Sequence, residues 1–128
     1  MASTVRASMD SELLSAILES GKSLYPRETV LLLRGKKEKD VIRVNDLLIP
    51  PLVSHGRHSA YTPLHMLPMD FSVVGSLHSH PSGDLTPSST DLNHFFGKIL
   101  MIIGFPFRDA RNVAIYDRGA KKLELEVV

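Results

Sequence analysis

The chain has 128 residues, of which 43% are hydrophobic and 23% charged, and its formal net charge is +1. These values are typical of one globular domain with its own core, and they exclude a largely disordered chain. The balanced charge, with lysine and arginine interspersed among acids, disfavours nucleic acid as the main partner. Cysteine is absent, which excludes disulfides, thiolate zinc sites and a cysteine nucleophile, so any metal must be bound by His, Asp or Glu.

The distribution of apolar residues gives an expectation for location and domain limits. The longest apolar run, residues 99–107, is too short to cross a bilayer, and the polar residues 1–8 lack the apolar region of a signal peptide. We therefore expect a cytoplasmic protein with no membrane partner. Residues 1–7 are expected to be a flexible lead-in and residues 8–128 a single domain.

The first predicted element is an amphipathic helix. Asp10 or Ser8 can cap it, its apolar residues share one face, and it runs to about Ser20, with Gly21 as a plausible stop. A second helix is predicted at residues 88–99, where apolar residues recur at the spacing i, i+3, i+4, i+7.

Most of the remaining chain predicts strands joined by turns. The hydrophobic runs place the strands at residues 28–34, 41–44, 71–80, 100–105, 112–116 and 121–128. The first two would form a hairpin across a charged turn at residues 35–39. The last strand alternates apolar and acidic residues, so one of its faces is expected to be buried. Prolines and a glycine interrupt residues 45–68, which therefore predict loops and short irregular pieces, with room for one brief strand.

One segment, residues 78–91, combines the side chains that a metal site requires. His78 and His80 are two residues apart at the end of a predicted strand, so their side chains share a face and can converge on one ion. Asp91 lies in the first turn of the next predicted helix, where the helix dipole favours a carboxylate. Three protein ligands leave a fourth position for water, which is typical of a catalytic zinc site.

Each of these residues also has a purely structural explanation. The histidines could be polar residues at a strand edge, and Asp91 could simply stabilise the start of the helix. Ser88 could be only the helix N-cap, a position for which Thr86 competes because Pro87 suits the first helical position. The metal site is favoured because these explanations require all the residues to coincide by chance.

The same segment resembles the signature of the JAMM (MPN-plus) metalloprotease family. That signature is His-x-His-Pro, six residues, then Ser-x-x-Asp, and the chain matches it at every specified position. The family also has a glutamate just after a proline and before an apolar run that ends in glycine, and residues 26–35 are similar to that element. The resemblance implies an α/β fold: a single domain with a mixed central β-sheet flanked by helices, in a cytidine-deaminase-like architecture.

The resemblance also implies a role for each residue that matches. His78, His80 and Asp91 would bind one Zn²⁺ per chain, which would lower the pKa of a bound water to about 7. Glu28 would be the general base and Ser88 would donate a hydrogen bond to the oxyanion. The implied reaction is hydrolysis of isopeptide or peptide bonds at the C-termini of ubiquitin-like or sulfur-carrier-type modifier proteins. The bound modifier tail is expected to lie extended near residues 45–68.

Five other polar residues near these segments have weaker indications. Asp84 is interpreted as a turn-forming acid and His94 as an exposed helix residue. His55 and His58 predict a polar loop that could face the substrate, and neither they nor His65 receive a defined role.

Two other functions are compatible with the motif. RadC-like proteins, which are associated with DNA processes, share an extended form of it that includes the Pro-Ser-Gly-Asp run, although the near-neutral charge and the Glu28 segment argue against this alternative. A non-catalytic MPN interaction scaffold is disfavoured by the intact ligand set. Many eukaryotic family members have an aromatic pair where this chain has Ser76 and Leu77, so it looks like the compact archaeal or bacterial type.

Overall fold

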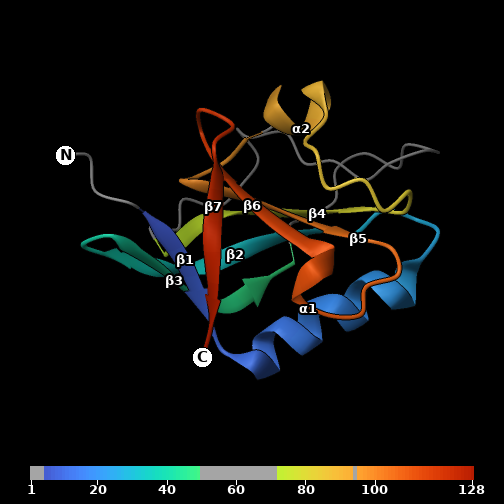
Figure 1. Cartoon of the computed structure of the whole chain (residues 1–128), viewed down its shortest axis with the longest axis horizontal. Helices are drawn as coiled ribbons and strands as arrows, with labels where there is room; N and C mark the ends of the chain where they lie inside the picture. The colour runs from blue at the N-terminus through green and yellow to red at the C-terminus, as the bar shows by residue number, and fades with distance from the viewer. Residues whose placement is uncertain (1–4, 50–71, 94) are drawn as a thin grey trace.

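The computed structural model, which describes residues 5–49, 72–93 and 95–128, contains a mixed sheet of seven strands in those ranges. The strands are β1 (Arg6–Met9), β2 (Val30–Glu38), β3 (Val41–Leu48), β4 (Val73–His80), β5 (Ile99–Gly104), β6 (Val113–Asp117) and β7 (Lys122–Val127). Their order is β1-β3-β2-β4-β5-β6-β7, and the sheet closes into a barrel because β1 also pairs with β7. Two α-helices, α1 (Ser11–Leu24) and α2 (Ser89–Asn93), and a 3₁₀ turn (Ala110–Asn112) complete the described structure (Figure 1).

The expected fold class is confirmed, since the chain forms one domain with a mixed sheet and helices beside it. The closure of the sheet was not expected. In Figure 1, α1 lies below the strands and α2 above them. Within the described ranges, no helix is long and apolar enough to cross a membrane.

Strand β1 corrects the expected N-terminal boundary. Arg6 and Ala7, which were expected in a flexible lead-in, pair in parallel with both β3 and β7. Ala7 and Met9 are buried in the core. This short strand could not be recognised from its own sequence because its two partner strands, distant in the chain, determine it.

Helix α1 begins as predicted but ends later. The Asp10 carboxylate accepts a hydrogen bond from the Leu13 N–H at 2.7 Å, which confirms Asp10 as the N-cap. The predicted stop at Gly21 is wrong, because the helix continues to Leu24. A Cβ at Gly21 would lie 2.8 Å from the ring of Phe107, so this glycine allows close helix packing.

The predicted β2–β3 hairpin is confirmed and is longer than expected. The strands pair antiparallel as far as Glu38 and Val41, so the charged turn contains only the residues between them. Residues 45–48, which were expected to begin a mainly irregular segment with room for one brief strand, belong to β3. Ile49 follows β3 without regular structure, and the remaining residues of that predicted loop, 50–68, lie outside the described residues.

The predicted helix at residues 88–99 is mostly wrong. Of the described residues in this range, only Ser89–Asn93 are helical, and Gly97, with a φ of 83°, turns the chain into β5. Phe95 packs against Leu100 and Ile102 of β5. The helix-like apolar spacing therefore arises from side chains that contact a neighbouring strand.

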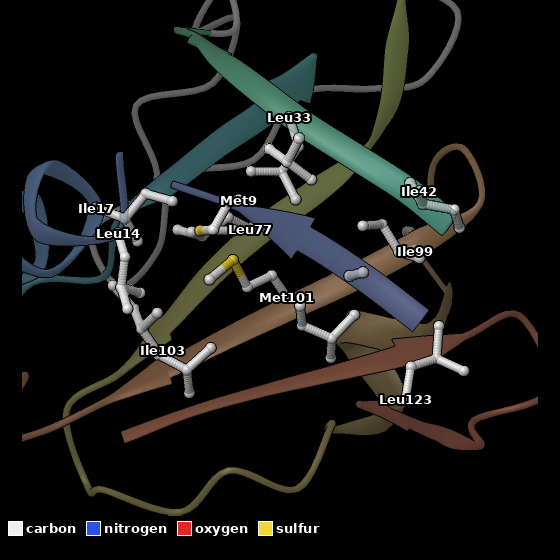
Figure 2. Packing of buried hydrophobic residues seen from close by; sticks show 14 of the residues in the cluster. Met9, Leu14, Ile17, Leu33, Ile42, Leu77, Ile99, Met101, Ile103 and Leu123 are labelled. Carbon is white, nitrogen blue, oxygen red and sulfur yellow. The ribbon is translucent and has the colours of Figure 1, made fainter. Parts of the chain in front are cut away.

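Strand β5 is buried on both faces, as its continuous apolar run indicated. Ile99, Met101 and Ile103 join the main core inside the barrel, and the alternate residues contact Phe95 on the other side. Figure 2 shows Met101 pointing into the same interior as Met9 of β1. This packing fixes β4, the neighbour of β5, whose last residues carry the candidate site.

Candidate metal centre

His78 and His80 lie at the C-terminal end of β4, between β2 and β5. His78 is opposite Val30 of β2, and His80 is beside Gly104 of β5. Ser79, between the two histidines, is fully buried, whereas each imidazole is 15% exposed. Because side chains alternate along a strand, both histidines point to the face opposite Ser79, as predicted.

Asp91, in the first turn of α2, contacts both imidazoles. Its Oδ2 is 2.8 Å from His80 Nε2, and its Oδ1 is 3.5 Å from His78 Nδ1. The residue is only 6% exposed. The structure therefore brings the three predicted ligands together at the end of β4.

A backbone carbonyl orients the ring of His80. His80 Nδ1 lies 2.7 Å from the carbonyl oxygen of Asp84, which can only accept, so Nδ1 carries a proton and Nε2 faces Asp91. The loop is held in turn by the Asp84 side chain, which accepts a hydrogen bond from the Thr86 N–H at 2.9 Å. This agrees with the interpretation of Asp84 as a turn-forming acid. Ligating histidines are commonly oriented by such a bond through the other ring nitrogen.

The charges of the cluster reinforce one another. Burial disfavours the ionised form of Asp91, but hydrogen bonds from His80 and from the Ser88 N–H, with the charges of both histidines, outweigh burial and lower the pKa of Asp91 to about 2. The hydrogen bond to Asp91 raises the pKa of His80 against the effect of burial, and the charge of Glu28 adds to that increase. Asp91 is therefore an anion at neutral pH, as a ligand for a cation must be.

Glu28 lies in the segment directly before β2, at the same end of the sheet. Its predicted strand begins later than expected, at Val30. Because Val30 is opposite His78 and the strands are antiparallel, the register carried two residues further places Glu28 opposite His80. Glu28 is exposed, and its charge acts on His80. The predicted base is therefore beside the predicted ligands.

Ser88 is the N-cap of α2. Its Oγ accepts a hydrogen bond from the Asp91 N–H at 3.0 Å, and its own N–H donates to Asp91 Oδ2 at 2.9 Å. This reciprocal pair is a capping box with aspartate in the third helical position. Of the two serine or threonine candidates for the cap, Ser88 rather than Thr86 takes the position. Its role as an oxyanion donor stays a prediction.

The donor set fits a zinc ion in type, and two of its three ligand separations can be compared with zinc geometry. Two ligand atoms of a tetrahedral zinc ion, each about 2.0–2.1 Å from the metal, are roughly 3.3 Å apart. The 2.8 and 3.5 Å contacts of Asp91 lie on either side of that value. In the described part of the chain, no group of three or more His, Asp or Glu side chains is arranged, as it stands, to hold a metal ion. Here the carboxylate closes directly on the imidazoles, and a bound ion would replace that direct contact.

Two features beside the site were not predicted. Ser79 hydrogen-bonds the segment that carries Glu28, and strand alternation alone could have indicated that it points away from the histidines. Phe105 donates its N–H to the His80 carbonyl, and its exposed ring stacks on that of Tyr25 at 4.8 Å. Nothing in the sequence connects these two aromatic residues.

The remaining histidines cannot be placed in the site. His55, His58, His65 and His94 lie outside the described residues. The interpretations of His94 as an exposed helix residue and of His55 and His58 as part of a polar loop stay predictions, and His65 has no defined role.

The chain is similar in sequence to known proteins over most of its length. The family model for prokaryotic homologs of the JAB domain matches residues 10–116. A probable metalloprotease of Haloferax volcanii is 38% identical over 118 residues, which cover 87% of this chain and 73% of that protein.

Solved structures agree with the sequence comparisons. A JAB1/MPN domain protein from Archaeoglobus fulgidus is 35% identical, with a TM-score of 0.68 over 99% of this chain and 100% of that chain. A structure described as a JAMM metalloprotease-like zinc site in the proteasome and signalosome is 32% identical, with a TM-score of 0.65 over 98% and 99% of the two chains. A protein from Desulfitobacterium hafniense, 15% identical with a TM-score of 0.63 over 95% and 92%, shares the fold alone. With the signature residues clustered at the end of β4 and these similarities over nearly its whole length, the chain belongs to the JAMM (JAB/MPN) family of metalloprotease-like domains.

Proposed function

We propose that this protein is a zinc-dependent hydrolase of isopeptide or peptide bonds at the C-termini of ubiquitin-like or sulfur-carrier-type modifier proteins. The observation that carries the proposal is the clustering of His78, His80 and Asp91 with Glu28 beside them. The relative named as a probable metalloprotease and the similar structure described as a metalloprotease-like zinc site support it.

In this proposal, His78, His80 and Asp91 hold one zinc ion per chain. The ion, when bound, would polarise the scissile carbonyl and lower the pKa of a water molecule. Ionised Asp91 would present a carboxylate oxygen as a ligand. His80, oriented through Nδ1, would present Nε2 once that nitrogen has lost its proton. The second imidazole comes from the same face of β4.

Glu28 and Ser88 act on the proton and on the developing charge. Glu28 takes a proton from the attacking water and passes it to the leaving amine, which its exposed position at the sheet end permits. The Ser88 hydroxyl can donate to the oxyanion while it accepts from the Asp91 N–H, because it has one hydrogen and two lone pairs. Such a donor typically contributes about 3–4 kcal/mol.

We propose that the modifier tail binds in an extended form along β3. This strand pairs with β1 only through Val41, Ile42 and Arg43, so within the described residues its later part has one edge without a partner strand. Leu48, at the end of that edge, is opposite Leu32 of β2, near the end of the sheet where the histidines lie. An added strand there would lead its C-terminus toward the site.

The reaction can be tested with a defined conjugate. Ubiquitin, and in parallel a sulfur-carrier protein, is joined through its C-terminus to the lysine side chain of a fluorescent peptide. The zinc-loaded protein should release the peptide, and a chelator, His80→Ala or Glu28→Gln should each reduce kcat by about 10²-fold or more. Glu19→Gln, which removes an exposed carboxylate that pairs with Lys22, is the matched control and should leave kcat unchanged.

Other outcomes would contradict the proposal in identifiable ways. Cleavage that survives the chelator or the two site variants would exclude this mechanism. Binding to DNA that weakens steeply with salt, without peptidase activity, would favour the RadC-like alternative. Zinc content below about half an equivalent after metal-replete expression would favour a non-catalytic scaffold.

A further inference from the structure

The residue pair at the end of the β2–β4 ladder is hydrogen-bonded in an irregular way. Thr29 and Ser79 are opposite each other, one step beyond Val30 and His78. A regular antiparallel pair of this kind exchanges two backbone hydrogen bonds. Ser79 N–H does donate to the Thr29 carbonyl, at 3.0 Å, but Thr29 N–H donates to the Ser79 hydroxyl, at 2.6 Å. A side chain has therefore replaced one backbone acceptor where β2 begins.

This bond is enclosed by the protein. Thr29 is 2% exposed and Ser79 is fully buried. Away from water, a peptide N–H that loses its acceptor has no water molecule to replace it unless the backbone moves, so the local structure depends on the hydroxyl. The hydroxyl of Thr29 also donates to the carbonyl of Ser20 in α1, at 3.3 Å, so the segment is held from two sides.

The bonded N–H belongs to the peptide group that joins Glu28 to Thr29. Fixing the plane of that peptide fixes the direction in which the chain leaves Thr29 and therefore the position of the Glu28 Cα. Because Glu28 itself is exposed, its backbone is the part that the core can constrain. Ser79 also lies between the two proposed histidine ligands, so a single stretch of β4 determines where both the imidazoles and Glu28 lie.

We propose that Ser79 is a positioning residue for Glu28, acting through the Thr29 N–H. The inference rests on the proposed function, in which Glu28 transfers the proton. Ser79 contacts neither the substrate nor the ion in this role. Without its hydroxyl, the Thr29 peptide would rotate or shift to find another acceptor and would carry Glu28 with it. A displacement of about 1 Å in a catalytic group can reduce a rate by about 10²-fold.

The test compares Ser79→Ala with Ser76→Ala in the zinc-loaded protein and the fluorescent conjugate described above. Ser76 is a second buried serine of β4, and its Oγ has no hydrogen-bond partner among the described residues, so its removal breaks no such bond. Ser79→Ala should lower kcat by about 10- to 100-fold, with KM and the zinc dissociation constant changed less than about threefold. Ser76→Ala should retain the wild-type kcat, and Ser79→Thr, which keeps the hydroxyl, should recover most of it.

A second readout is independent of activity. Amide hydrogen exchange followed by NMR should become at least about 10-fold faster at Thr29 in Ser79→Ala, and not in Ser76→Ala, while the amides of β5 stay protected. If Ser79→Ala fails to fold, Ser79→Cys replaces it, because a thiol has a similar shape and is a weaker acceptor. A wild-type kcat in either folded variant would overturn the inference, as would unchanged exchange at Thr29.

A double-mutant cycle separates this inference from the proposed function. In a Glu28→Gln background, Ser79→Ala should reduce kcat by less than about threefold further, because the base that it positions is already gone. Fully multiplicative losses would show that Ser79 acts on something else and would overturn the inference alone. A wild-type kcat in Glu28→Gln would instead refute the proposed role of Glu28, while the exchange of Thr29 would still report whether Ser79 holds its peptide.

Discussion

Replacement of Asp91 by asparagine tests the electrostatics of the site in the metal-free protein. The change preserves the shape of the side chain and removes its charge. The pKa of Asp91 is about 2 in the folded protein, against an ordinary value of 3.8. A shift of one unit corresponds to about 1.4 kcal/mol, so the folded state favours the ionised carboxylate by about 2 kcal/mol. Asp91→Asn should therefore lower the free energy of unfolding by about 2 kcal/mol at pH values where both Asp91 and His80 are charged.

Two titrations limit the pH range over which this stabilisation is present. Because the folded pKa of Asp91 is lowered, its contribution is complete above the ordinary value of 3.8 and is lost as the pH falls through about 2. Because the folded pKa of His80 is raised, its contribution is complete below 6.5 and is lost as the pH rises through the higher folded value. Both contributions come from the contact between Asp91 and His80. The difference in the free energy of unfolding between wild type and Asp91→Asn should therefore be largest between the ordinary pKa values of 3.8 and 6.5.

Urea unfolding in the presence of a chelator, followed by circular dichroism, measures the difference. We expect the wild-type protein to be more stable than Asp91→Asn by about 2 kcal/mol near pH 5.5, and by less at about pH 2.5 and pH 9. The matched control is Asp10→Asn, because Asp10 also caps a helix, through the Leu13 N–H, and asparagine is an equally good cap. A difference for Asp91→Asn that is the same at all three pH values, or absent near pH 5.5, would refute this reasoning.

Two further predictions concern the ion and the backbone. Zinc should bind more weakly as the pH falls from about 8 to about 6, because His80, whose pKa is raised, must lose its proton to become a ligand. Competition titration measures the zinc dissociation constant, and a value that does not change with pH would contradict this prediction. Gly97→Ala should lower the free energy of unfolding by more than about 1 kcal/mol, since Gly97 has a φ of 83° and an added Cβ would lie 2.6 Å from the Val74 carbonyl. Gly119→Ala, whose Cβ would meet only the Asp117 side chain at 3.4 Å, should change it little, and equal urea midpoints for the two variants would count against the argument.

Local sequence signals predicted structure well where one short-range interaction or a simple alternation decides it. The cap of α1 depends on a hydrogen bond between Asp10 and Leu13, which are three residues apart. A short stretch of sequence is therefore enough to indicate where this helix begins. The alternation in β7 was similarly readable: Leu123 is buried and Leu125 packs against the core, although Val127, at the end of the strand, is 39% exposed. The shared face of His78 and His80 follows from the same rule.

Predictions failed where a distant segment decides the local structure. The spacing that suggested a helix over residues 88–99 is satisfied by Phe95 packing on the outside of β5, which a local pattern cannot distinguish from a helix face. Gly21 looked like a helix stop because a glycine is usually placed there for its backbone freedom. In this fold it is inside α1 because Phe107 requires the space that a side chain would occupy.

In the candidate site, some residues are positioned by local sequence signals and others by distant segments. The proposed ligands could be predicted because the two histidines and Asp91 lie in one short segment whose strand, turn and helix start are each locally encoded. Glu28 could be proposed only from the family resemblance, since its approach to His80 depends on the register between β2 and β4. That register is in turn completed at the Thr29–Ser79 pair, where a hydroxyl replaces a backbone acceptor. Ser79 occupies the open position of the His-x-His signature. Its hydroxyl joins the β4 segment that carries the two histidines to the segment that carries Glu28, and this link becomes visible only when β2 and β4 are paired.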